Sequence, residues 1–384
     1  MIDIQDKKMC TGCTACMNSC PVGCITMKED VEGFLYPSVD SDKCIGCNRC
    51  VNVCPFNDSP CAADHKAYAV RTSFESTSSS GGAISSICAR YLTQGWSIYG
   101  AAFDKNLDVV HIKAADEQKL ASLSTSKYLQ SRLDMIFSAV RNDLSGGQKV
   151  LFVGTPCQVA GLRSFIGEND DLLTVQIACH GVPSAKLWKA YLHSLETSFG
   201  EKIQSVNFRD KSNGWKRYNI AYTTASGISK VQFDKDTYML AYLQNLSLRP
   251  SCYDCRFRGS AYADLVAGDF WNIAEALPDH DGSKGFTLLS AVTPAGSRVI
   301  EELASDAGNT LCIPVDFSIA KRSNSGYAQH VDMPQRREEF FDGLYDNDDL
   351  IGHMEGFIER KSKTRSLYAR LHTFLSGIKK KIIR

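Results

Sequence analysis

Two cysteine runs with the same spacing constrain the fold of this chain more than any other feature. The segments CTGCTACMNSCP and CIGCNRCVNVCP both follow the pattern C-x2-C-x2-C-x3-C-P. The first contains Cys10, Cys13, Cys16 and Cys20, and the second contains Cys44, Cys47, Cys50 and Cys54. Bacterial ferredoxins hold two iron–sulfur cubes with such runs, and the fourth cysteine of each run ligates the other cube. We therefore predict two 4Fe–4S clusters.

The repeat also predicts which cysteines share a cluster. One quartet combines three residues of the first run with the last residue of the second: Cys10, Cys13, Cys16 and Cys54. The other quartet is Cys44, Cys47, Cys50 and Cys20. Paired zinc knuckles are a weaker interpretation, because tetrahedral zinc sites combine two ligand pairs rather than three residues plus one. A disulfide framework is disfavoured by the internal repeat and by the intracellular character of the remaining sequence.

The whole chain is long enough for two or three domains and carries no net charge. It has 384 residues, of which 43% are hydrophobic, and 43 Lys and Arg balance 43 Asp and Glu. Zero net charge argues against a nucleic acid as partner. The first residues lack an apolar stretch typical of a signal peptide, and no apolar run predicts a membrane-spanning helix. With 16 cysteines, these features predict metal ligation in the reducing environment of the cytoplasm.

Composition and pattern divide the chain into three regions. We expect a small ferredoxin domain with two 4Fe–4S clusters over residues 1–62, a larger α/β domain over 63–330 and a helical, basic C-terminal tail over 331–384. The small domain cannot build a substantial apolar core, so the bound clusters should stabilise its fold. Cys24 stands outside both quartets and is interpreted as a packing residue, as are Cys88 and Cys312.

A glycine-rich entry to a helix is the first notable feature of the larger domain. In SSSGGAISSICARYLTQG, Ser80, Gly81 and Gly82 precede an apolar face that includes Ile84 and Ile87. Free N–H groups at such an entry suit a phosphate or pyrophosphate. Flexible glycines beside an ordinary helix start explain the pattern at least as well.

Four further cysteines follow later in the chain. Two buried strands lead into GTPCQVAGL and CHG, so Cys157 and Cys179 should lie at carboxyl ends of strands, where open α/β sheets place ligands. The helix start should stabilise a Cys157 thiolate. RPSCYDCRFR adds Cys252 and Cys255. The residues alone leave three interpretations open: buried cysteines beside a small zinc loop, a dithiol redox pair, or a third iron–sulfur cluster.

The last residues of the chain are basic. From 359 to 384 there are nine Lys and Arg residues and one acidic residue, and apolar residues recur along one face of a predicted helix. Such a helix docks on its own domain or frays. The alternative is a surface helix that binds an anionic membrane or a partner.

Five segments together resemble the beta subunits of coenzyme F-420 hydrogenases and dehydrogenases: GTPCQVAGL, CHGVPS, FRDKSNGW, RPSCYDCRFR and GDFW. The wider family includes flavin-containing bacterial relatives such as hydroxymethyl-chlorophyll reductases. The resemblance extends over residues 67–271, and the cysteine-rich module in front matches family members with that fusion.

This resemblance implies that the α/β domain binds FAD and holds a 4Fe–4S cluster of its own. The implied cluster ligands are Cys157, Cys179, Cys252 and Cys255. The implied cofactor-binding residues are Ser80, Gly81, Gly82, Lys127, Tyr128, Gly154, Thr155, Gln158 and Trp215. The residues implied to act on a small anionic substrate are Lys127, Arg209 and Lys211. Lys127 would stabilise a reduced, anionic flavin ring.

The function expected from these features is that of an iron–sulfur flavoprotein oxidoreductase. It would pass electrons between the ferredoxin-type clusters and FAD, and so reduce or oxidise a small organic or deazaflavin-type substrate. The alternative is an electron-transfer subunit without a substrate of its own. A ferredoxin-like or other redox protein is the expected partner, and the basic tail adds possible peripheral membrane contact.

Overall fold

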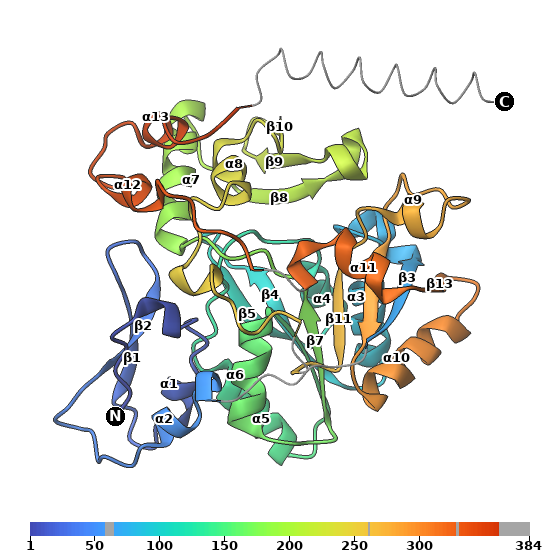
Figure 1. Cartoon of the computed structure of the whole chain (residues 1–384), viewed down its shortest axis with the longest axis horizontal. Coiled ribbons are helices and arrows are strands. Elements are labelled where there is room, and N and C mark those ends of the chain that lie inside the picture. Colours follow the sequence, from blue (N-terminus) through green and yellow to red (C-terminus); the bar gives the residue numbers. More distant parts are fainter. Residues whose placement is uncertain (58–64, 260–261, 328–329, 361–384) are drawn as a thin grey trace.

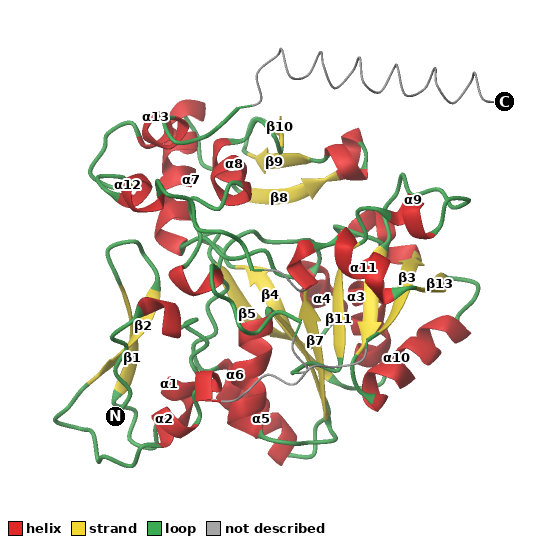
Figure 2. Cartoon of the chain, in the orientation of Figure 1, coloured by secondary structure: helices red, strands yellow, loops and turns green. Residues whose placement is uncertain are grey.

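A computed structural model describes residues 1–57, 65–259, 262–327 and 330–360 of the chain. Its strands form a large sheet of eight, a second sheet of three and a two-stranded hairpin. The hairpin belongs to the cysteine-rich N-terminal domain at the lower left of Figure 1, and the three-stranded sheet lies above the large one. Figure 2 shows these as three separate groups of strands.

The N-terminal domain contains the hairpin and two short helices. Strand β1 (Ile25–Glu29) pairs antiparallel with β2 (Leu35–Val39). Helices α1 (Ala15–Ser19) and α2 (Arg49–Asn52) both follow a residue with a left-handed backbone. The apolar core of this domain is small and consists largely of cysteines, so we expect ligation to stabilise it.

The large sheet has the strand order β13-β3-β12-β11-β7-β6-β4-β5. Strands β4, β6, β7 and β11 are parallel neighbours, and β3 runs in the same direction beyond the antiparallel β12. The carboxyl ends of these five strands therefore meet at one edge, the usual ligand-binding edge of an α/β sheet. The bounds are β3 (Lys66–Thr72), β4 (Ser97–Phe103), β5 (Val109–Ala114), β6 (Val150–Gly154), β7 (Leu172–Ile177), β11 (Leu265–Asp269), β12 (Thr287–Ala291) and β13 (Thr310–Val315).

Helices cover both faces of the large sheet, because consecutive residues of a strand point to opposite sides. Leu151 of β6 belongs to one core, with α3 (Ala83–Thr93) and α10 (Pro294–Ser305). Its neighbour Phe152 belongs to another core, with α5 (Ile136–Ser145) and α6 (Pro156–Ile166). Shorter helices of this region are α4 (Glu117–Leu123), α9 (Ile273–Ala276) and α11 (Phe317–Ser323).

A further core lies between the three-stranded sheet and four helices. The sheet has the order β10-β9-β8, and the elements are β8 (Ser205–Asp210), β9 (Asn219–Thr223), β10 (Ile228–Gln232), α7 (Ala185–Phe199), α8 (Thr237–Leu243), α12 (Arg337–Phe341) and α13 (Leu350–Glu355). Phe340, Leu344 and Met354 are buried in this core. The predicted boundary at residue 331 is therefore wrong as the start of a separate tail. The predicted basic helix after residue 360 lies outside the described residues.

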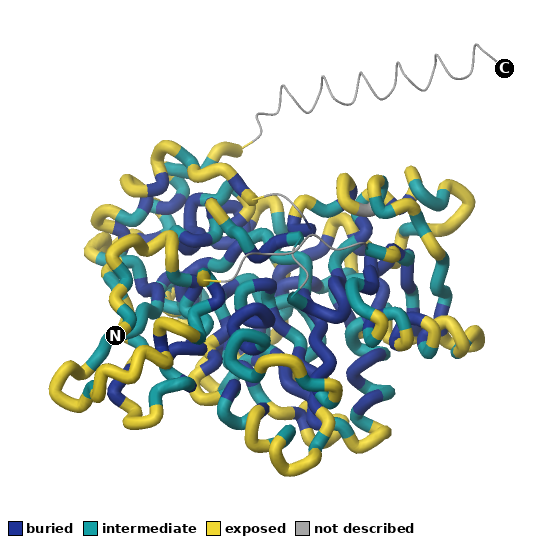
Figure 3. The backbone as a smooth tube through the Cα atoms, turned by 60° about the horizontal axis from the view of Figure 1, so that its bottom comes forward, coloured by how far each residue is buried: buried dark blue, intermediate teal, exposed yellow. Residues whose placement is uncertain are grey.

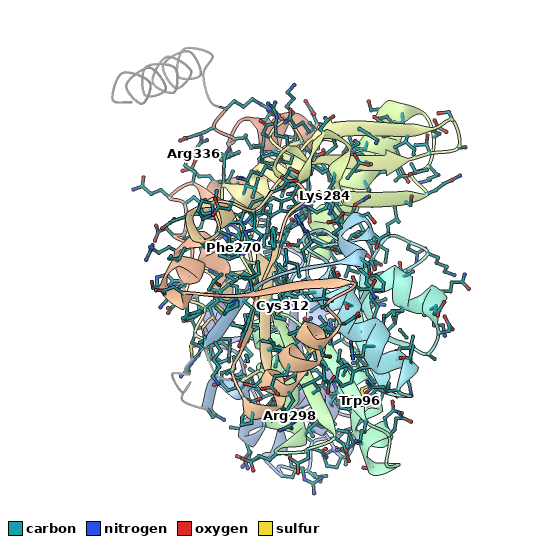
Figure 4. All side chains as sticks on the ribbon, turned by 90° about the vertical axis from the view of Figure 1, so that its right-hand side faces the viewer. Trp96, Phe270, Lys284, Arg298, Cys312 and Arg336 are labelled. Atoms are coloured by element: carbon teal, nitrogen blue, oxygen red, sulfur yellow. The ribbon has the colours of Figure 1, made fainter. Side chains whose placement is uncertain are left out.

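Seven single 3-10 turns connect these elements within the described residues: η1 (Lys7–Met9), η2 (Pro55–Asn57), η3 (Ser73–Thr77), η4 (Lys211–Asn213), η5 (Trp215–Arg217), η6 (Pro250–Cys252) and η7 (Ser325–Tyr327). In Figure 3 buried backbone concentrates in the interior and exposed backbone in the peripheral loops. Cys88 is buried, as expected of a packing residue. Cys312 is only half-buried, because it lies on the edge strand β13 that crosses the front of Figure 4.

Candidate functional site

Both cysteine quartets predicted from the N-terminal repeat surround cavities. The first cavity, cavity I, is lined by Cys10, Cys13, Cys16 and Cys54. The second, cavity II, is lined by Cys20, Cys44, Cys47 and Cys50. Cys24 also lines cavity II, where its Sγ lies 3.4 Å from Cys20 Sγ. The fold thus brings together the residues of each predicted quartet, although they are up to 44 positions apart (54 − 10). Their assignment as ligands remains a prediction.

The four dispersed cysteines surround a third cavity, cavity III. It is lined by Cys157 in the first turn of α6, Cys179 after β7, and the pair Cys252 and Cys255 at η6. The carboxyl ends of β6 and β7 deliver the first two, since these strands are parallel neighbours. Nucleation of α6 by Pro156 at its first position sets the direction of Cys157.

Cavity III also contains a hydroxyl group without a protein partner. Ser251 lines it, and its Oγ atom is buried without a hydrogen-bond partner. The Thr11 hydroxyl, which also lines the cavity, faces the Cys157 thiol. A buried hydroxyl without a partner is costly unless something accepts its proton. The sulfurs of a bound cluster are suitable acceptors, so the residues present fit such a group. In the described part of the chain no three His, Cys, Asp or Glu side chains converge as a single metal ion requires.

Burial raises the pKa of three of the thiols around cavity III, those of Cys157, Cys179 and Cys252. Burial, and next the charge of Cys255, raise the pKa of Cys252 to about 12. The pKa of Cys157 is raised by burial first and then by the same neighbour, Cys255. The helix start was expected to stabilise a Cys157 thiolate, whereas burial shifts the pKa of this thiol in the opposite direction. A bound metal would deprotonate its thiol ligands outright.

Cavities I and III adjoin each other. Thr11 lines both, and Gly161 of α6 lies against the Cys13 side chain, because a Cβ at Gly161 would lie 2.9 Å from Cys13 Sγ. Gln130 lines cavity III and donates from Nε2 to Thr11 O over 2.8 Å. Cys16 of cavity I and Cys50 of cavity II pack in the same small core. Cavity I therefore adjoins both cavity II and cavity III, and cavity III lies at the carboxyl edge of the large sheet.

A second group of predicted residues gathers on the loop before α3. Arg209 donates to Ser79 O over 3.0 Å and to Asp269 Oδ2 over 2.8 Å. Trp215 Nε1 also donates to Ser79 O, and Lys211 Nζ donates to Ser80 O. The Arg209 guanidinium lies over the Tyr218 and Trp271 rings. Loops after β3, β8 and β11 thus converge on one spot at the carboxyl edge, which we call the Ser79 site.

The predicted flavin residue Lys127 does not join the Ser79 site through its ammonium group. Lys127 Nζ donates to the carbonyls of Ser122, Leu123, Ser124 and Thr125. These are the last carbonyls of α4 and the turn after it, so the side chain caps a helix C-terminus. Burial lowers the pKa of Lys127 to about 7. Its neighbour Tyr128 does reach the site, because Tyr128 Oη accepts from Arg209 over 3.0 Å.

The glycines before α3 are required by packing. A Cβ at Gly81 would lie 2.3 Å from Val70 O and 2.6 Å from Thr287 N. Gly82 has a φ of +86°, and its Cβ would lie 2.6 Å from Thr72 Oγ1. Ser80 Oγ donates to Phe286 O over 2.8 Å. The loop is thus pressed onto β3 and the residues before β12, which explains the glycines without a phosphate.

Two residues predicted to bind the cofactor line cavity III instead of the Ser79 site, and a third lies beside them. Thr155 and Gln158 line cavity III, and Thr155 N donates to Gln158 Oε1 over 3.0 Å. Gly154 packs against Phe152 and Gln158. They shape the start of the helix that carries Cys157. Inspection of the sequence missed Thr11, Arg249 and Ser251 at cavity III, although all three stand within two residues of a predicted cysteine ligand or in the RPSC segment.

Both the large domain and the N-terminal cysteine-rich domain match models of known protein families. Residues 147–312 match the family model that describes the C terminus of the coenzyme F420 hydrogenase/dehydrogenase beta subunit. This part of the chain is therefore similar to the C-terminal domain of that beta-subunit family. Two models of a 4Fe–4S dicluster domain match residues 9–57 and 36–87. The predicted resemblance is thereby confirmed, and so is the iron–sulfur, electron-transfer character of the N-terminal domain.

Among solved structures, the xenon-derivatised F420-reducing NiFe hydrogenase complex from Methanosarcina barkeri contains a similar chain. The alignment covers 75% of this chain and 94% of that one, with 15% identity and a TM-score of 0.47. No curated protein matches the chain. No helix among the described residues has the length and apolar character needed to cross a membrane.

Proposed function

We propose that the chain is an FAD-containing iron–sulfur oxidoreductase with three 4Fe–4S clusters, one at each cysteine-lined cavity. Iron–sulfur clusters supply one-electron transfer, and FAD exchanges one electron with them or two with an organic substrate. The substrate would be a small organic or deazaflavin-type molecule. The observation that carries the proposal is the row of three cavities, each lined by four of the predicted cysteine ligands.

The Ser79 site supports the proposal that FAD binds at the carboxyl edge of the sheet. The half-buried Trp271 stacks on the buried Trp215 with ring centroids 4.7 Å apart, so Trp271 is the flat aromatic ring that a ring cofactor would contact. Arg209 Nε is buried without a hydrogen-bond partner and is a donor for a carbonyl or anionic group. The first turn of α3, where Ala83 N already donates to Thr287 Oγ1 over 3.5 Å, would face the phosphate of the cofactor.

One observation favours the alternative function, an electron-transfer subunit without its own substrate. Arg209 and Lys211 were expected to bind a small anion, yet both donate to loop carbonyls, and Arg209 also pairs with Asp269. Their charges are thus directed at the protein in this arrangement. A subunit of this kind would deliver electrons to a redox partner protein.

Metal and flavin analysis of anaerobically purified protein tests the proposal. Three four-iron clusters predict about twelve iron atoms per chain, with FAD in near one-to-one amount in the boiled supernatant. A Cys252→Ser variant should lose about four of these irons, whereas Cys312→Ser, which changes a cysteine outside all three cavities, should lose none. About eight irons in the unchanged protein would contradict the third cluster. Flavin that is reoxidised by a partner protein alone, and by no small molecule, would select the alternative.

A further inference from the structure

The side chain of Arg249 is buried at the junction of cavities I and III. Only 1% of the residue is exposed. Nε donates to Cys10 O over 2.9 Å, and one terminal nitrogen donates to Leu35 O over 2.8 Å. The other terminal nitrogen donates to Gln130 Oε1 over 3.1 Å. The guanidinium therefore joins η6 of the large domain to two main-chain oxygens of the dicluster domain.

These hydrogen-bond acceptors carry no charge, and the described residues provide no carboxylate as a salt-bridge partner of Arg249. Other buried arginines of this chain do have one: Arg209 pairs with Asp269, and Arg337 pairs with Glu32. An arginine cannot lose its charge in a protein, and a buried charge without a counter-ion is strongly unfavourable. The fold thus leaves one positive charge uncompensated by the protein at this point.

The surroundings of Arg249 indicate what compensates this charge. Its Nη2 nitrogen lies 3.8 Å from Cys10 Sγ, a predicted ligand at cavity I. The residue also lines cavity III, and its own carbonyl accepts from Cys252 N over 2.9 Å. A four-iron cluster held by four thiolates is an anion, and its reduction adds a further negative charge. The cation therefore stands beside two anionic sites.

We propose that Arg249 is a positioning residue that acts as a shared counter-ion for the clusters at cavities I and III. Its charge favours the reduced form of both clusters, because net charge and hydrogen bonds to sulfur set cluster potentials. Its hydrogen bonds to Cys10 O and Leu35 O hold the dicluster domain at the distance that the two sites require. Cavity II, which Arg249 does not line, lies outside its direct influence. The inference deepens the proposed function and rests on it for the cluster at cavity III.

Redox titration of the reconstituted full chain, followed by electron paramagnetic resonance, tests this role. Arg249→Gln should lower the midpoint potentials of two clusters and leave the third, at cavity II, unchanged. The electron paramagnetic resonance signal that is absent from the Cys252→Ser variant belongs to the cluster at cavity III. Arg337→Gln is the matched control, since it removes another buried arginine that links the two domains but lines none of the three cavities described. It should loosen the domain contact without shifting any potential.

Unshifted potentials in Arg249→Gln, or the same shift in Arg337→Gln, would overturn the inference. If Arg249→Gln fails to load its clusters, Arg249→Lys decides, because it keeps the charge. Arg249→Lys should have the same iron content as the unchanged protein and nearly the same midpoint potentials. Loss of iron, or a shift in midpoint potential as large as that in Arg249→Gln, would overturn the role of charge. If the unchanged protein holds clusters only at cavities I and II, the proposed third cluster is refuted. The midpoint potential of the cluster at cavity I would still test the role of Arg249.

Discussion

Single residues of this protein differ in whether their charges are neutralised by the fold. The buried pair of Arg209 and Asp269 lies at the Ser79 site, with Nη1 and Oδ2 2.8 Å apart. The pair of Lys230 and Asp210 lies nearby at the surface of the three-stranded sheet. Removing one partner of a buried pair leaves the other charge without compensation, whereas an exposed charge is solvated by water. The two pairs should therefore respond very differently to the same chemical change.

Asp269→Asn should destabilise the protein by about 3 kcal/mol, because Arg209 stays buried with its charge unpaired. Asp210→Asn should cost less than about 1 kcal/mol, because its partner Lys230 is exposed and stays solvated. Urea denaturation followed by tryptophan fluorescence compares the two free energies of unfolding. Equal costs would show that water reaches Arg209 in solution.

His111 predicts a dependence of stability on pH. Burial lowers its pKa from 6.5 to about 4, and its ring nitrogens face Ser131 Oγ at 2.7 Å and Val153 O at 3.0 Å. Between these pKa values the unfolded chain binds a proton that the folded chain does not, so stability is complete above pH 6.5 and falls toward pH 4. Going from pH 7 to pH 5 should cost about 2 kcal/mol through this residue.

The matched measurement compares three proteins at both pH values. His111→Gln should lose about 2 kcal/mol less stability than the parent when the pH falls. His193→Gln, which replaces an exposed imidazole, should lose as much as the parent. An identical loss in all three proteins would mean that His111 is protonated in the folded state.

At the scale of elements, two explanations apply to the glycines of the loop before α3. Its sequence suggested a phosphate site, whereas its packing on β3 and β12 requires glycine regardless of any ligand. Helix α6 is similar, because Gly161 is needed for the approach of the Cys13 side chain. In both elements a glycine permits a close approach to its backbone, by backbone atoms at Gly81 and by the Cys13 side chain at Gly161. No local pattern reveals such a contact.

Gly81→Ala should destabilise the protein by about 2–3 kcal/mol, since the added methyl group meets backbone atoms of β3 and β12 that cannot rotate away. Gly146→Ala is the control, because its Cβ would contact only its own helix end at 3.4 Å and its φ is −81°. Thermal unfolding and flavin content should be measured together. Normal stability with lost flavin would assign Gly81 to the cofactor instead.

At the scale of the whole molecule, the dicluster domain is held by polar contacts with residues far along the chain. Arg337 donates with two nitrogens to both carboxylate oxygens of Glu32, over 2.9 and 2.6 Å. Tyr345 Oη donates to Glu32 O over 2.9 Å, and Asn18 Nδ2 donates to Asp134 O over 2.9 Å. Residues 331–360 thus help to keep cavity I against cavity III.

Glu32→Gln should loosen this contact, because the buried Arg337 loses its charged partner. Hydrogen exchange should become faster across β1 and β2, at least several-fold, while iron content stays near that of the parent. Glu29→Gln provides the control on the same hairpin, since Glu29 is exposed and forms no salt bridge among the described residues. Unchanged exchange in Glu32→Gln would mean that other contacts hold the hairpin in place.

The sequence by itself determined which cysteines were grouped into quartets, the helix after Gly82, the buried strands before Cys157 and Cys179, and the resemblance to the beta-subunit family. Ligand spacing and hydrophobic periodicity are local properties, so they can be read from neighbouring residues. Only the tertiary structure decided that cavity I, rather than cavity II, adjoins cavity III, that Lys127 caps α4, and that Arg249 is a buried cation at the junction. These facts depend on contacts between residues up to 239 positions apart. No local pattern encodes such contacts, because burial and charge compensation arise only when distant segments pack together.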